Sequence, residues 1–271
     1  MTPGGALVPS WTGVAASAVL VGLALAVVVS ARLGLAREVV VAALRAGVQL
    51  VAVGAVLRLL FVHTGLPGSL GWVAGMVVVA GRVAGGRGRG VPRSYAVATA
   101  AVAAGVAATL GILIAAGVIA TEPRVVVPVG GMVVSTAMQG SAITLARLRD
   151  EVTASRRLVE ARLALGLPST EAFAPQLRQA LISALTPSLD NTKVVGLIAL
   201  PGAMTGLILA GVSPLTAIRY QIVVMYMLLG AASLAALVTA RLAARALFDP
   251  AHRLRELEPA GVRRWWSRPA A

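Results

Sequence analysis

Few residues of this chain could perform chemistry, and most of the charged ones are arginines. The sequence has 24 basic and 10 acidic residues, two histidines and no cysteine. Without cysteine there can be no disulfide, no thiolate nucleophile and no thiolate metal site. The chain also lacks the phosphate-binding GxxxxGK[ST] loop and the GxSxG and HExxH motifs of hydrolases. We therefore predict no catalytic residue, no cofactor and no enzyme activity of its own.

The remaining candidates are polar residues inside apolar stretches. An ionisable group at bilayer depth costs at least about 2.5–3.5 kcal/mol, so each such residue needs a reason. Arg45 and Gln49 lie one helical turn apart, and we expect them to brace the second span against the fifth or sixth. Gln139 and Gln221 could either form hydrogen bonds between helices or line a translocation path. Asp190 could attract a cation at the mouth of such a path, or pair with Lys193 three residues later.

One apolar run, from Ser188 to Gln221, is interrupted by helix-breaking residues. Breakers in lipid are tolerated where neighbouring protein satisfies the freed backbone groups. Gly202 and Gly206 form a GxxxG pair that allows another helix to approach closely. We predict a gate here, with static close packing as the alternative. Its candidate residues are Pro201, Gly202, Met204 and Gly206.

The elements that carry these residues are membrane helices. Hydrophobic residues make up 58% of the chain, well above the roughly 45–50% of soluble domains. About 20 apolar residues cross a bilayer as a helix, which predicts an all-α, multi-pass protein with about seven spans. The spans are Val8–Val29, Val39–Phe61, Ser69–Gly85, Ser94–Ala120, Val125–Leu145, Val194–Val212 and Leu215–Ala240.

Charge is distributed unevenly between the connections. The connections after the first, third, fifth and seventh spans are rich in arginine, and the others are nearly uncharged. By the positive-inside rule this places the N-terminus outside and the C-terminus inside the cytoplasmic membrane. We interpret the net charge of +14 as arginines that orient the protein against anionic lipid, and we expect no nucleic-acid partner. His63 and His252 fall on opposite sides, which predicts no histidine metal site.

The segment 147–190, after the fifth span, is predicted to form an elbow in the cytoplasm. Residues 155–165 are strong helix formers, and the helix should end at Gly166. Ser169 or Thr170 could cap a short turn that includes Ala172. A second, amphipathic helix should follow and lead to Pro187 and into the sixth span. Residues 1–248 would form the membrane domain and 249–271 a basic cytoplasmic tail.

Within the elbow, Glu160, Ala161 and Gly166 have the EAxxxxG spacing found in the cytoplasmic loop of ABC transporter permeases. The longer runs ARLALGLPSTEAF and LPGAMTGLILAGVSP, with ALRAGVQLVAVG and PVGGM upstream, resemble the FetB family of such permeases. These are bacterial iron exporters related to plant aluminium-tolerance half-transporters. The resemblance extends from about Glu38 to Phe248, but Ser135-Thr136 stands where the family usually has Gly-Asn.

The resemblance implies a permease subunit that exports iron or another metal ion, with ATP bound by a separate ATPase subunit. It further implies coupling through Glu160, Ala161, Gly166 and Ala172, and a homodimeric membrane core. A nucleotide sugar or another small solute is the alternative cargo. An ion-coupled secondary carrier or channel is the rival class, and such a protein should carry an acid within a span.

Overall fold

The computed structural model describes residues 10–63 and 65–257, and every regular element in them is a helix. The helices are α1 (Trp11–Ser30), α2 (Ala36–His63), α3 (Leu66–Arg87), α4 (Ser94–Ala115), α5 (Pro123–Ala164), α6 (Ser169–Ala172), α7 (Ala174–Val194), α8 (Gly202–Leu209) and α9 (Pro214–Leu247). Six of them, α1–α5 and α9, are long and apolar enough to cross a membrane. The all-α, multi-pass class is thereby confirmed, while the inside–outside orientation stays a prediction.

The predicted sixth span is wrong as a single helix. Helix α7 continues past Pro187 to Val194, and α8 begins only after Pro201. Between them the chain leaves the helix, with Gly196 at φ +80°. Glycine adopts this left-handed conformation without the cost of a Cβ, and proline cannot continue a helical hydrogen-bond ladder from its nitrogen. The clustered breakers thus divide the apolar run into two helices.

Two helices are much longer than the bilayer requires. Helix α5 has 42 residues and α9 has 34, or about 63 and 51 Å of helix against a hydrocarbon core of about 30 Å. The fifth span continues without a loop into the first helix of the elbow, and the predicted division between the two helices is confirmed as a kink. Ser155, with φ −112° and ψ 15°, marks a kink between them. Its hydroxyl donates to the carbonyl of Glu151 at 2.6 Å, and such a bond bends helices.

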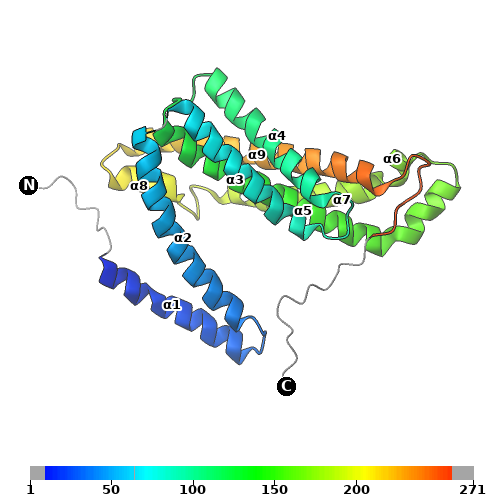
Figure 1. Ribbon diagram of the computed structural model, residues 1–271, viewed down its shortest axis with the longest axis horizontal. Coiled ribbons are helices and arrows are strands. Elements are labelled where there is room, and N and C mark those ends of the chain that lie inside the picture. The colour runs from blue at the N-terminus through cyan, green and yellow to red at the C-terminus, as the bar shows by residue number, and fades with distance from the viewer. Residues whose placement is uncertain (1–9, 64, 258–271) are drawn as a thin grey trace, which may run out of the picture.

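The long helices pack through small side chains. Helices α3, α4, α5, α7 and α9 form a bundle, in which α5 and α9 lie side by side along much of their length (Figure 1). A Cβ at Gly140 would come within 2.8 Å of the carbonyl oxygen of Ala232. Ser141 and Thr239 form a fully buried hydrogen bond of 2.8 Å across the same seam. Small residues at helix contacts are how membrane helices associate without a hydrophobic driving force between them.

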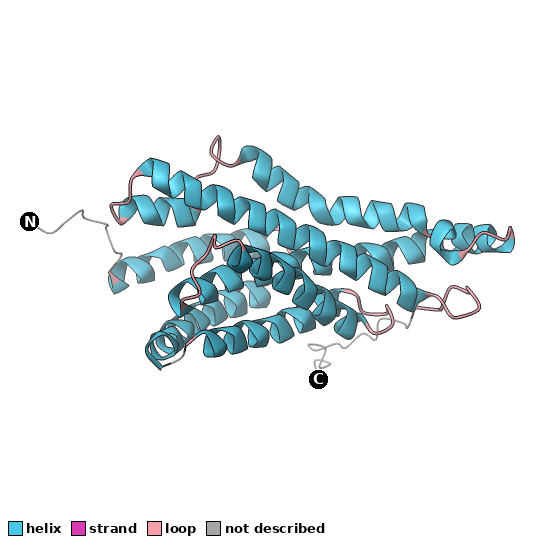
Figure 2. Cartoon of the chain, turned by 90° about the horizontal axis from the view of Figure 1, so that it is seen from above, coloured by secondary structure: helices cyan, strands magenta, loops and turns pink. Residues whose placement is uncertain are grey.

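Helices α1 and α2 extend away from the bundle within one chain (Figure 1), and Figure 2 shows that every regular element in the described part of the chain is a helix. None of the α1 residues is buried, and α2 packs mainly on α1. Arg45 and Gln49 are exposed, and no described residue bonds to either side chain. The prediction that they brace the second span against the fifth or sixth is wrong within a single chain, because α2 has little contact with either. The exposed apolar side chains of this pair suit lipid or a second copy of the chain.

Replacing Gly140 with alanine should loosen the α5–α9 seam. The added methyl group meets a backbone oxygen, which cannot rotate away, so we expect unfolding free energy to fall by about 1–3 kcal/mol. Thermal unfolding of the detergent-solubilised protein measures the change. Gly131→Ala on the same helix is the control, because its Cβ would meet only the flexible Met76 side chain at 3.9 Å. Equal midpoints for the two variants would contradict a close-packed seam.

Candidate functional site

The elbow lies at one end of the bundle, far from α8 at the other (Figure 1). Helix α5 ends at Ala164, and Gly166 follows at φ +89°, as its position in the sequence predicted. The N–H of Gly166 donates to the carbonyl of Leu163, and that of Leu167 to the carbonyl of Arg162. These bonds satisfy the last carbonyls of the helix and reverse the chain. The expected cap by Ser169 or Thr170 is wrong: Pro168 is the N-cap of α6, and no side chain caps it.

Three of the four predicted coupling residues face outward. Glu160, Ala161 and Gly166 are exposed, and the neighbouring Leu165 keeps 80% of its surface accessible. Ala172 is fully buried instead, and its carbonyl accepts a hydrogen bond from the Nη1 of Arg162 at 3.1 Å. The elbow thus has an exposed tip with both apolar and charged residues. The buried Ala172 contributes to that tip indirectly, through its hydrogen bond with Arg162.

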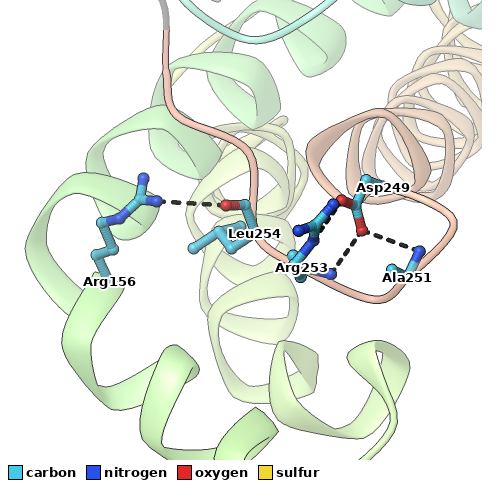
Figure 3. A network of polar contacts seen from close by, with 5 residues as sticks. All are labelled: Arg156, Asp249, Ala251, Arg253 and Leu254. Carbon is cyan, nitrogen blue, oxygen red and sulfur yellow. Dashed lines mark hydrogen bonds and ion pairs between the residues drawn. The ribbon is translucent and has the colours of Figure 1, made fainter.

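Sequence analysis missed a second part of this site, which we call the strap: residues 248–257, after α9. The carboxylate of Asp249 accepts hydrogen bonds from the backbone N–H of Ala251 and of Arg253, and from the Nε of Arg253 (Figure 3). The backbone bond from Arg253 is the main cause that lowers the pKa of Asp249. The Asp249-Pro250 pair was the signal available in the sequence, since this dipeptide favours a turn.

The strap joins α9 to the elbow through Arg156. Its guanidinium donates to the carbonyl oxygens of Leu254 and Arg255 at 3.3 and 3.2 Å, and its Nε pairs with Glu160 at 2.8 Å. Figure 3 shows the bond to Leu254. The Leu254 side chain is buried in the cluster that contains Val152 and Val159 of α5.

Two further contacts connect the strap to the α6 region. The rings of Phe248 and Phe173 meet edge to face at 5.7 Å. Ser169 Oγ and His252 Nδ1 lie 2.8 Å apart. Motion of the elbow must therefore move the end of α9 or break these contacts.

Toward the other end of α9, a cavity of about 460 Å³ brings several predicted path residues together. Pro201 and Met204, at the start of α8, face Gln221 of α9 across it, with Met225 and Tyr226 alongside. Gln221 is only 6% exposed, and its Oε1 has no hydrogen-bond partner among the described residues. A buried amide without a partner costs about 1–3 kcal/mol, so this atom points to a ligand, water or a neighbouring chain.

The other predicted path residues lie elsewhere. Gln139 is exposed on α5, and Arg45 and Gln49 are exposed on α2. Gly202 and Gly206 are exposed on α8, and nothing lies within 4 Å of a Cβ at either, so no helix that the structure describes packs on the GxxxG pair. Asp190 is exposed and forms the expected ion pair with Lys193 at 3.2 Å.

The cavity has neutral donors and acceptors rather than a charged cage. No group of three histidine, cysteine, aspartate or glutamate side chains is placed to hold a metal ion in the described part of the chain. Its lining includes the amide of Gln221, the thioethers of Met204 and Met225, and the hydroxyl-bearing residues Thr192 and Tyr226. Thioethers prefer soft ions, and the amide oxygen accepts a hydrogen bond or contacts a cation.

Replacing Gln221 with leucine should stabilise the protein or leave its stability unchanged. The change removes a buried acceptor that has no partner and keeps a similar volume, so we expect the free energy of unfolding to rise by up to about 1–3 kcal/mol. The measurement is thermal unfolding in detergent. Gln139→Leu, at an exposed site on α5, is the matched control and should change little. A clear loss of stability in Gln221→Leu alone would show that its amide is bonded in the working protein.

Comparison with known proteins agrees with this architecture. The model of the uncharacterised protein family UPF0014 matches residues 11–248. The UPF0014 membrane protein STAR2 of Oryza sativa subsp. japonica is 44% identical over 243 residues, which cover 90% of this chain and 85% of that protein. The protein ALUMINUM SENSITIVE 3 of Arabidopsis thaliana is 40% identical over 244 residues, or 89% and 88% of the two chains.

A bacterial relative carries a more specific name. The "Probable iron export permease protein FetB" of Escherichia coli is 33% identical over 223 residues, which cover 82% of this chain and 86% of that protein. No solved structure matches the chain. The family expected from the sequence motifs is confirmed by these relatives. With its helical membrane architecture and matches across nearly its whole length, this chain belongs to the UPF0014 family of membrane proteins.

Proposed function

We propose that this chain is the membrane-spanning permease subunit of an ABC transporter in the cytoplasmic membrane. The elbow is the single observation that carries the proposal. It is an exposed tip at the end of the segment of α5 that follows the Ser155 kink, and the strap braces it against α9. A separate ATPase that closes on ATP would push this tip, and α5 and α9 would transmit the push into the bundle. The chain would bind no ATP itself.

The proposed cargo is iron or another metal ion, moved outward. The support is the name of the Escherichia coli relative, together with the cavity that Gln221, Met204 and Met225 line. A nucleotide sugar or other small solute is the alternative, because that cavity has neutral walls. Gln221, Pro201 and Met204 are the residues we expect to contact cargo. Gly202, Gly206, Gln139, Asp190, Arg45 and Gln49 keep their proposed role in the path only if a second copy of the chain completes it.

We further propose a homodimeric membrane core. Each chain supplies one elbow, and two ATPases would need two elbows. The exposed α1–α2 pair and the uncovered glycine face of α8 provide apolar surface for lipid or for a second chain. Crosslinking through cysteines introduced at Gly202 tests this arrangement, because the chain has no natural cysteine to interfere.

The decisive experiment places the purified protein in liposomes with a candidate ABC ATPase subunit from the same cell. Cargo-dependent stimulation of ATP hydrolysis, together with metal transport that stops without ATP, supports the proposal. Transport driven by an ion gradient with no ATPase present would establish the rival secondary carrier. ATP-dependent transport of a nucleotide sugar and not of metal would keep the permease role and change the cargo.

An arginine at Ala161 should uncouple the two subunits. Ala161 is exposed, so the larger charged side chain fits without disturbing the bundle, yet it occupies the surface offered to the ATPase. We expect at least a tenfold loss of cargo-stimulated ATP hydrolysis, with an unchanged thermal midpoint. Ala154→Arg adds the same side chain at an exposed site one residue before the kink and serves as the control. Equal activity in both variants would remove the elbow from the coupling mechanism.

A further inference from the structure

Two adjoining cavities at the elbow-side end of α9 share the same arginines. One, of about 420 Å³, lies between the start of α4 and the end of α9. The other, of about 650 Å³, lies between α9, the strap and the α6 region. Arg245 and Arg255 line both cavities, Arg93 lines the first and Arg241 lines the second. We call these four residues the arginine cluster.

The arginine cluster has no balancing acid. Asp249 is the one acidic residue that lines either cavity, and its carboxylate is already bonded to Arg253 and to the N–H of Ala251. Glu256 follows Arg255 in the strap but lines neither cavity. None of the four arginines forms an ion pair with a residue that the structure describes. Positive charges gathered in this way repel one another, and a bound anion would lower their energy.

The cluster also lies where two membrane helices leave the apolar layer. Arg93 directly precedes α4, one of the candidate spans, and Arg241 and Arg245 belong to the last turns of α9. The smaller cavity adds an apolar side to the arginines, formed by Ala96, Val97 and Leu242. A ligand there would meet positive charge at one end and hydrocarbon at the other.

The strap brings Arg255 into this position. If the chain did not turn back after α9, Arg255 would lie farther from the bundle. The N–H of Arg255 donates to the carbonyl of Leu247 at 2.8 Å, and Arg156 bonds the carbonyl of Arg255 itself. The strap residues beside it are held by the Asp249 network that Figure 3 shows. The backbone of Arg255 is thus fixed from both sides.

We propose that the arginine cluster binds the phosphate headgroup of an anionic phospholipid of the adjacent leaflet. One guanidinium group can donate two parallel hydrogen bonds to two oxygens of a phosphate. Basic pockets between membrane helices are also known to bind lipid headgroups. The apolar side of the smaller cavity favours a lipid over soluble phosphate, because an acyl chain can cover the exposed Ala96 and the partly exposed Leu242. Lipid held there bridges α4, α9 and the strap. This site is independent of the proposed transport function.

The test compares lipid binding to the full-length protein in nanodiscs of phosphatidylcholine doped with phosphatidylglycerol. Native mass spectrometry should show retained phosphatidylglycerol, and the double variant R245Q/R255Q should retain at least fivefold less. The matched double variant R157Q/R178Q removes the same charge from exposed sites that line neither cavity, and it should bind like the wild type.

Two results would overturn the proposal. Equal loss of lipid in both double variants would mean that net charge alone attracts it. Displacement of the lipid by millimolar inorganic phosphate, with no preference for phosphatidylglycerol over phosphatidylcholine, would mean that the cluster is a soluble-anion site. Thermal midpoints of all variants are measured in phosphatidylcholine alone, so that a folding defect is distinguished from a loss of lipid affinity.

Discussion

The close approach of α5 and α9 is the constraint on which the rest of the structure depends. Between two helices in lipid, burial of apolar surface gives little net gain, so contact must come from dispersion at short range. Because Gly140 has no side chain, the backbone of α5 can approach the backbone of α9 at Ala232. The buried hydrogen bond between Ser141 and Thr239 fixes the register of the two helices. Larger side chains would separate the helices and expose that hydroxyl pair to hydrocarbon, where it would lose its partner.

This seam gives the molecule one continuous mechanical element. From Gln221 to Leu247, α9 provides about 40 Å of unbroken helix, with the cavity at one end and the strap at the other. Helix α5 runs beside it and carries the elbow. Two packed helices, with one kink in α5 at Ser155, connect the tip to the cavity without a loop between them. The strap also ties the elbow to the end of α9. Arg156 pairs with Glu160 in the elbow and donates to the carbonyl oxygens of Leu254 and Arg255, which follow α9.

The sequence predicted the parts of this structure that depend on local patterns. Apolar stretches of sufficient length located α1–α5 and α9, and Gly166 located the end of the elbow helix, because each signal lies within a few neighbouring residues. It named Pro201, Met204 and Gln221 among nine candidate path residues, and these three line one cavity, while the path itself stays a prediction. The strap was missed because Arg156 and Leu254 are 98 residues apart, and no local pattern reports that contact.

The error in the sixth span has a physical origin and a functional consequence. Hydropathy measures how favourably a segment enters lipid, and the run from Val194 to Val212 enters favourably whether its helix is whole or broken. The break after Val194 leaves backbone groups that need partners, and local bonds supply some of them. The N–H groups of Leu197 and Ile198 donate to the carbonyl of Val194, and that of Gly196 donates to the carbonyl of Ala199. Helix α8 is thus a short separate helix that packs on the long α9, while α7 packs on α5 and α9. Because the Gln221 cavity has Pro201 and Met204 on one side and α9 on the other, its shape depends on the angle between one short helix and one long one.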